Sequence, residues 1–188
     1  MLISFTGRAR NGKTTAAEAI AARADELHLV PVIYDIGAFV LEHCHAEGLI
    51  PAELTREQLS AAQLEILVRV GKEKRAENPR FWIERIETDY KRLCGLEREP
   101  GPKFVALIPN LRYQNEAKMV RNLGGVVVKV SALNKDGSPY ISKDRDPNDP
   151  SETQLLHLSS DYTITAQVGH SDLIAGIARL IFERELAK

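Results

Sequence analysis

The sequence predicts an α/β fold in three layers, with a five-stranded parallel sheet and helices on both of its faces. Short apolar runs alternate along the chain with longer amphipathic segments, which is the order of strands and crossover helices in such a sheet. The run 103–108 is apolar without interruption, as expected for a strand that is buried on both faces. Right-handed crossovers then place a ligand at the carboxyl ends of the strands.

The chain begins with a strand and a helix that flank a glycine-rich turn. Residues 1–6 are short and apolar, and residues 15–27 are rich in alanine and glutamate. The next apolar run, 28–34, predicts a second strand, and the segment 36–45 predicts a helix after it.

Two helices are expected before the third strand. Thr55 and Gln58 have the spacing of a capping box, so an amphipathic helix is expected over 55–76. A proline at position 79 restarts the chain, and 80–93 is the next helix.

The second half of the chain repeats the alternation of strand and helix. After the strand at 103–108 comes a short helix at 114–123, which a Gly-Gly pair ends. A fourth strand is expected at 126–130 and a fifth at 162–165. Residues 171–186 form a closing amphipathic helix.

Between the first strand and helix lies a complete G-x-x-x-x-G-K-[ST] motif, from Gly7 to Thr14. Unpaired backbone N–H groups converge in such a loop, and the dipole of the following helix favours negative charge. Lys13 is expected to reach the β- and γ-phosphates of ATP and to act in catalysis, and the Thr14 hydroxyl is expected to bind Mg²⁺. The predicted ATP-binding residues are Gly7, Arg8, Ala9, Arg10, Asn11, Gly12, Lys13, Thr14 and Thr15.

The composition is that of an ordinary soluble protein. The net charge is −1 over 188 residues, so the molecule as a whole does not attract nucleic acid. No apolar run is long enough to span a membrane, and the N-terminus lacks the basic region of a signal peptide. Cys44 and Cys94 are expected to be free thiols in a cytoplasmic enzyme.

A polar stretch at 131–150 follows the fourth strand, and loops of this length inside a compact domain are usually functional. As a lid, it would bring Lys143 and Arg145 over the transferring phosphoryl group, where Arg145 would be catalytic. The alternative is a solvated loop whose own aspartates neutralise these bases. A helix is expected to begin after Asp149, with a proline at its first position.

Several stretches resemble the phage-type deoxynucleoside monophosphate kinases. The segment 108–117 (IPNLRYQNEA) leads to the glycine pair and the fourth strand, as in that family's strand, D-V-R-F/Y-x-N-E-A and G-G order. The segments 70–75 and 79–82 are similar to its G-x-x-x-R and P-x-x-W patterns, and 150–152 is similar to the end of its H-P-S-E segment. Together with the phosphate loop, the resemblance covers nearly the whole chain.

The resemblance implies ATP-dependent phosphorylation of a deoxynucleoside monophosphate with Mg²⁺, in the host cytoplasm if the protein is phage-encoded. Arg75 and Arg112 match positions that face the acceptor nucleotide, and a guanidinium binds phosphate oxygens two at a time. Trp82 is a candidate to stack on the acceptor base, with packing in its helix as the alternative. Asp35 would orient the acceptor or act as a base, with capping of the next helix as the alternative.

Three positions depart from the family pattern. Asn110 stands where the family has an acidic residue that would help to hold Mg²⁺. Thr14 stands where several members have aspartate, which restores the usual hydroxyl ligand of the metal. Asp149 replaces the histidine of H-P-S-E.

A single kinase domain over 1–188 is therefore expected. Its core is 1–35, 103–130 and 160–188, its acceptor-binding helical region is 36–102, and its lid is 131–152. The expected partners are small-molecule nucleotides, without a membrane, and a homodimer is compatible with the sequence. Two alternatives stay open: a kinase acting on a hydroxyl of a nucleoside or nucleic acid, and a nucleotide-binding regulatory protein with little turnover.

Overall fold

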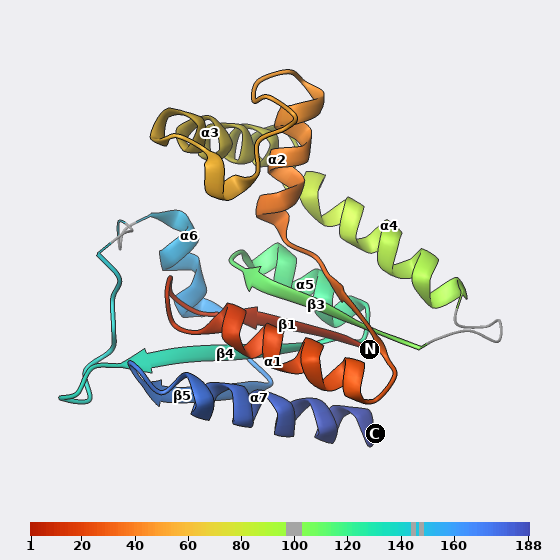
Figure 1. The fold of residues 1–188 in the computed structure, drawn as a ribbon, viewed down its shortest axis with the longest axis vertical. Coiled ribbons are helices and arrows are strands. Elements are labelled where there is room, and N and C mark those ends of the chain that lie inside the picture. The colour runs from red at the N-terminus through yellow and green to blue at the C-terminus, as the bar shows by residue number, and fades with distance from the viewer. Residues whose placement is uncertain (97–102, 144–145, 147–148) are drawn as a thin grey trace. The chain divides into compact units, whose positions relative to one another are not determined.

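The computed structural model describes residues 1–96, 103–143, 146 and 149–188 (Figure 1). The chain divides into two compact units. The first unit contains Met1–Tyr34 and Asp89–Lys188, and the second contains Asp35–Thr88. Helix α4 (Phe81–Leu96) contributes residues to both.

The first unit is built on a parallel sheet with the strand order β2-β3-β1-β4-β5. All of its pairings are parallel, as the sequence predicts. Because β1 is central, its carboxyl end lies between those of β3 and β4. The strands are β1 (Leu2–Thr6), β2 (Val30–Ile33), β3 (Phe104–Leu111), β4 (Val126–Leu133) and β5 (Tyr162–Gln167).

Helices cover both faces of this sheet. Helices α1 (Lys13–Glu26) and α7 (Ser171–Leu186) lie side by side on one face, and α5 (Gln114–Asn122) lies on the other (Figure 1). Ile3 and Phe5 point into the core that α1 and α7 cover. Since side chains alternate along a strand, the residues between them face the opposite layer. None of the helices in the described ranges is long and apolar enough to cross a membrane.

The bounds of four strands differ from those predicted by more than one residue. β5 continues to Gln167, beyond the predicted end at 165. β2 begins only at Val30, because His28 has a φ of 57° and the chain is still turning there. β3 continues to Leu111, beyond the predicted end at 108. β4 continues to Leu133, because its pairing with β5 extends to Gln167, so the first residues of the predicted lid are strand.

The chain reverses direction just after β4. Leu133 forms an isolated antiparallel bridge with Pro139, and Gly137 between them has a φ of 84°. The Asp136 carboxylate accepts a hydrogen bond from the Ser138 N–H at 2.9 Å, which closes the turn. After the partly described residues 140–149, the chain forms the short helix α6 (Pro150–Thr153) and the 3₁₀ turn η2 (Gln154–His157).

The second unit is helical and contains α2 (Ile36–Ala46), the 3₁₀ turn η1 (Arg56–Gln58) and α3 (Ala61–Glu77). The predicted start of the long helix at 55 is wrong. The Thr55 capping box closes only η1, and a second box formed by Ser60 and Gln63 starts α3. Two capping boxes five residues apart look alike in sequence, and only the second leads into a helix with a buried stripe.

Tyr34, at the carboxyl end of β2, provides a test of the fold's response to pH. Its side chain is 4 % exposed. Burial, reinforced by the Asp89 carboxylate, raises the pKa of Tyr34 to about 12, whereas an unfolded tyrosine titrates near 10. The folded state therefore keeps a proton that the unfolded chain loses, and the free energy of unfolding falls as the pH rises from 10 to 12.

Between pH 10 and 12, we expect Tyr34→Phe to reduce this fall in the free energy of unfolding by on the order of 2 kcal/mol. Urea unfolding at a series of pH values from 9 to 11.5 measures it. Tyr140→Phe is the matched control, and it should keep the wild-type slope. Equal slopes in the wild type and Tyr34→Phe would contradict the assignment.

Candidate phosphate-binding site

The loop between β1 and α1 depends on two glycines. Gly7 has a φ of 138°, and a Cβ placed on it would lie 2.1 Å from the carbonyl oxygen of Val130. Gly12 has a φ of 90°, and a Cβ there would lie 2.5 Å from the Cδ1 atom of Ile174. The loop is thus pressed against β4 and α7 at positions where only hydrogen fits.

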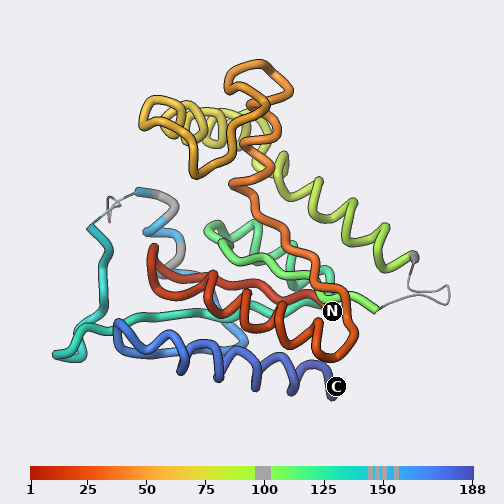
Figure 2. The backbone as a smooth tube through the Cα atoms, in the orientation of Figure 1, coloured from red at the N-terminus to blue at the C-terminus, as the bar shows by residue number. Residues whose placement is uncertain are grey.

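The loop leads directly into the N-terminus of α1. Figure 2 shows the chain leaving β1, turning, and running back along α1. Gly12 is the N-cap, no side chain within the described residues caps this end, and the first turn carries no acidic residue. The first N–H groups of the helix, with their dipole, are therefore available to an anion.

Lys13 is the first residue of α1, and its side chain is buried in the site. The residue is 4 % exposed, and its Nζ donates a hydrogen bond to the carbonyl oxygen of Arg8 at 2.8 Å. The ammonium group is thus folded over the loop itself. A buried lysine at the mouth of an anion-binding loop supplies the fixed positive charge that a polyphosphate needs.

Other loop residues hold its shape. Asn11 is buried. With its amide oxygen toward β4, it accepts a hydrogen bond from the Ala132 N–H at 3.2 Å and donates one to the Ala9 carbonyl at 3.3 Å.

Just before the loop, the Thr6 hydroxyl is buried without a hydrogen-bond partner in the described ranges, and the same holds for Nη1 of Arg8. These two polar atoms are of the kind that a bound anion satisfies.

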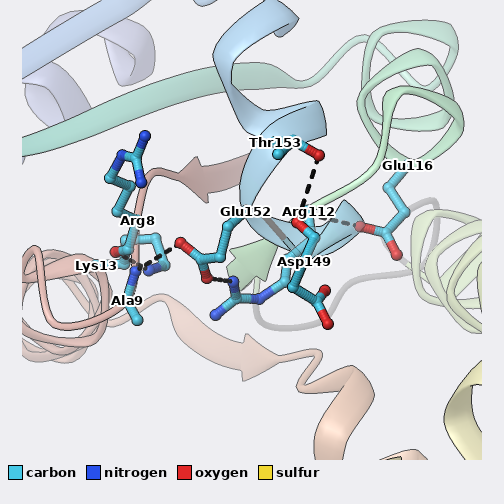
Figure 3. A network of polar contacts seen from close by, with 8 residues as sticks. All are labelled: Arg8, Ala9, Lys13, Arg112, Glu116, Asp149, Glu152 and Thr153. Atoms are coloured by element: carbon cyan, nitrogen blue, oxygen red, sulfur yellow. Dashed lines mark hydrogen bonds and ion pairs between the residues drawn. The ribbon is translucent and has the colours of Figure 1, made fainter. Parts of the chain in front are cut away.

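The Glu152 carboxylate contacts both the loop and Arg112, the residue that follows β3 (Figure 3). Its Oε2 accepts a hydrogen bond from the Ala9 N–H at 3.4 Å. Its Oε1 forms an ion pair with Nη1 of Arg112 at 2.5 Å. The carboxylate is 3 % exposed and the arginine side chain 18 % exposed, so both charges are largely removed from water.

The start of α5 fixes the backbone that follows β3, and with it the position of Arg112. The Glu116 carboxylate accepts hydrogen bonds from the N–H groups of Arg112 at 2.7 Å and Tyr113 at 3.1 Å. Of the side chains proposed for the acceptor, Arg112 is thus placed by the structure next to the phosphate loop.

The other acceptor candidates belong to the second unit, and each has a local contact there. The Asp35 carboxylate accepts from the Gly37 N–H at 2.8 Å and caps α2. Arg75 donates to the carbonyl oxygen of Gly71 at 3.2 Å. The indole N–H of Trp82 donates to the same carbonyl at 3.4 Å, and the ring is 3 % exposed. Packing and capping are therefore observed for these residues, and their contacts with substrate stay predictions.

The second unit also has a cavity with aromatic walls. Its volume is about 400 Å³. His43 packs edge-on against both Phe81 and Trp82, and the Arg85 guanidinium lies 4.0 Å above the Phe39 ring. The cavity is lined by Phe39, Glu42, His43, Ala46, Phe81, Trp82 and Arg85.

The predicted lid is only partly described. Lys143 is exposed, and Arg145 lies outside the described residues. The contacts of Glu152 are not predicted from the sequence, in which this residue is part of a helix start and of the segment similar to H-P-S-E. The contact of Glu152 with Ala9 spans 143 positions in the chain, so no local pattern signals it.

Comparisons with known proteins give similarity of structure alone. No protein-family model matches the chain, and no curated protein is significantly similar to it in sequence. Among solved structures, an APS kinase of Mycobacterium tuberculosis is 16 % identical with a TM-score of 0.46, covering 97 % of this chain and 96 % of that one.

Two shikimate kinases are also similar. The enzyme of Aquifex aeolicus is 14 % identical with a TM-score of 0.44, covering 99 % of this chain and 98 % of that one. The enzyme of Acinetobacter baumannii is 16 % identical with a TM-score of 0.41, covering 98 % and 94 %. At identities of 14–16 % and TM-scores below 0.5, these similarities do not show what the chain binds.

Proposed function

We propose that this protein is a P-loop kinase that transfers the γ-phosphoryl group of ATP to a deoxynucleoside monophosphate. The observation that carries the proposal is the buried Lys13 at the first position of a helix, behind a loop that only glycines at 7 and 12 allow. This combination binds a polyphosphate and keeps a positive charge beside the phosphoryl group.

The reaction needs little covalent chemistry from the protein. A phosphate oxygen of the acceptor forms a bond to the γ-phosphorus, and the bond from that phosphorus to the β,γ-bridging oxygen breaks, so ADP leaves. The acceptor phosphate is already an anion and has no proton to lose. Catalysis is then positioning and charge neutralisation, which Lys13 and the loop N–H groups provide.

The site offers a fitting ligand for Mg²⁺. Thr14 lies in the first turn of α1 and is exposed, and hydroxyl oxygen is a ligand that this ion accepts. Bound by Thr14 together with phosphate oxygens, the ion would neutralise charge that develops on the transferred group.

The acceptor side of the proposal rests on residue chemistry. Arg112, in the first unit, keeps further N–H donors after pairing with Glu152, and Arg75, in the second unit, is the other arginine that the resemblance assigns to the acceptor. The resemblance of these positions to the deoxynucleoside monophosphate kinases supports a nucleotide acceptor. An aromatic cavity such as the one at Trp82 suits a flat base.

A panel of acceptors tests the function. The protein is incubated with Mg²⁺ and ATP labelled in the γ-phosphate, and with deoxynucleoside monophosphates, nucleosides or a 5′-hydroxyl oligonucleotide. We expect label in deoxynucleoside diphosphates alone. Label in a nucleoside or oligonucleotide would identify a hydroxyl kinase, and no transfer despite ATP binding would identify a regulatory protein.

A further inference from the structure

Glu152 contributes a negative charge to a site that is otherwise suited to anions. Its carboxylate accepts a hydrogen bond from the Ala9 N–H, one of the loop groups expected to face phosphate (Figure 3). Lys13 is meanwhile turned onto the Arg8 carbonyl of the same loop. The free protein therefore satisfies part of its phosphate site with its own groups.

We propose that Glu152 is an internal competitor for polyphosphate, which holds the Ala9 N–H in the free protein and gives it up when polyphosphate binds. The inference rests on the proposed function only in requiring that the loop binds polyphosphate. It does not depend on phosphoryl transfer or on the identity of the acceptor.

The two contacts of the carboxylate differ in a way that decides which one is released. The bond to Ala9 is long, at 3.4 Å, whereas the ion pair with Arg112 is 2.5 Å. A phosphate bound to the loop would place like charges within a few ångströms in a poorly solvated site, which is strongly unfavourable. The weaker loop contact is then lost, and Arg112 stays with Glu152 and offsets its charge.

Glu152→Gln is the direct test, because it removes the charge and keeps the size and an oxygen acceptor for Ala9. The probe is inorganic tripolyphosphate, titrated calorimetrically at pH 7.5. We expect its dissociation constant to fall at least threefold. Adenosine, which carries no charge, should bind both proteins equally, since the competition is between anions.

Glu116→Gln is the matched control. Glu116 is an equally buried carboxylate that also contacts Arg112, but it bonds to backbone N–H groups rather than to the loop. Glutamine preserves its capping role, so tripolyphosphate affinity should stay at the wild-type value. A similar gain in both variants would show a general effect of charge and would overturn the proposal.

A second pair of variants covers the case in which Glu152→Gln fails to fold, because it leaves Arg112 buried without its partner. Arg112→Gln leaves the carboxylate at the loop without its counter-ion, so tripolyphosphate should bind more weakly than to the wild type. Adding Glu152→Gln to the Arg112→Gln variant should lower the dissociation constant of tripolyphosphate at least threefold. This comparison isolates the carboxylate, since Arg112 is absent from both proteins.

The outcomes separate the inference from the proposed function. Unchanged or weaker tripolyphosphate binding after loss of the Glu152 charge, in either background, overturns the inference even if the enzyme phosphorylates nucleotides. Tighter binding supports it even if no acceptor is ever phosphorylated. Absence of tripolyphosphate binding in every variant also overturns it, because there would be no anion for Glu152 to oppose.

Discussion

Lys13→Ala is expected to abolish nearly all phosphoryl transfer while the fold remains intact. The Lys13 ammonium is buried at the head of α1 and is held over the phosphate loop by its bond to the Arg8 carbonyl. Its charge interacts most strongly with the transferring phosphoryl group, where negative charge spreads over the equatorial oxygens. Removing one such fixed group typically lowers kcat by about 10²–10³-fold or more.

Stability should change little, because the hydrogen bond from Lys13 to the Arg8 carbonyl is worth only about 1 kcal/mol. Single-turnover rates report the chemical step, and urea unfolding reports the fold. Lys118→Ala, at an exposed position of α5 in the same unit, is the control and should retain wild-type turnover. If Lys13→Ala retained a large share of kcat, the loop would hold something other than the reacting phosphates.

The parts of this molecule that the sequence predicts are those with local causes. The two glycines of the loop motif permit a backbone with positive φ, and the structure has φ values of 138° at Gly7 and 90° at Gly12. The apolar run of β3 likewise identifies a strand that is buried on both faces. Both features depend on residues within a few positions of one another, so a pattern of neighbouring residues is enough to predict them.

The features that the sequence does not predict depend on contacts between residues far apart in the chain. Glu152 reaches Ala9 across 143 positions, and it meets Arg112 across 40. The extension of β4 to Leu133 depends on pairing with β5, and the residues 131–133 alone give no sign of it. Where two local signals compete, as at Thr55 and Ser60, tertiary packing decides which of them starts the long helix.

Asp35 and Arg75 distinguish a phosphate acceptor from a hydroxyl acceptor, and we expect the results of a phosphate acceptor. A hydroxyl must lose its proton as it attacks, so a carboxylate near it acts as a base, and removing such a base costs about 10²–10⁴-fold in rate. A phosphate acceptor has no such need, and Asp35 can then only orient it. Asp35→Asn should therefore raise the acceptor KM and leave kcat within a few-fold of the wild type.

Asp35→Asn should leave the fold unchanged. The Asp35 side chain caps α2 by accepting a hydrogen bond from the Gly37 N–H, and asparagine caps a helix equally well.

Arg75→Ala should raise the acceptor KM by about 10- to 100-fold, with little change in ATP affinity. This is the effect of losing a charge-assisted hydrogen bond worth about 1.5–3 kcal/mol. Arg69→Ala is the control on the same helix, since Arg69 pairs with Glu73 at the surface and should be silent. Steady-state kinetics with saturating ATP measure all three variants. Loss of turnover in Asp35→Asn at saturating acceptor, with Arg75→Ala near normal, would replace the nucleotide kinase with a hydroxyl kinase.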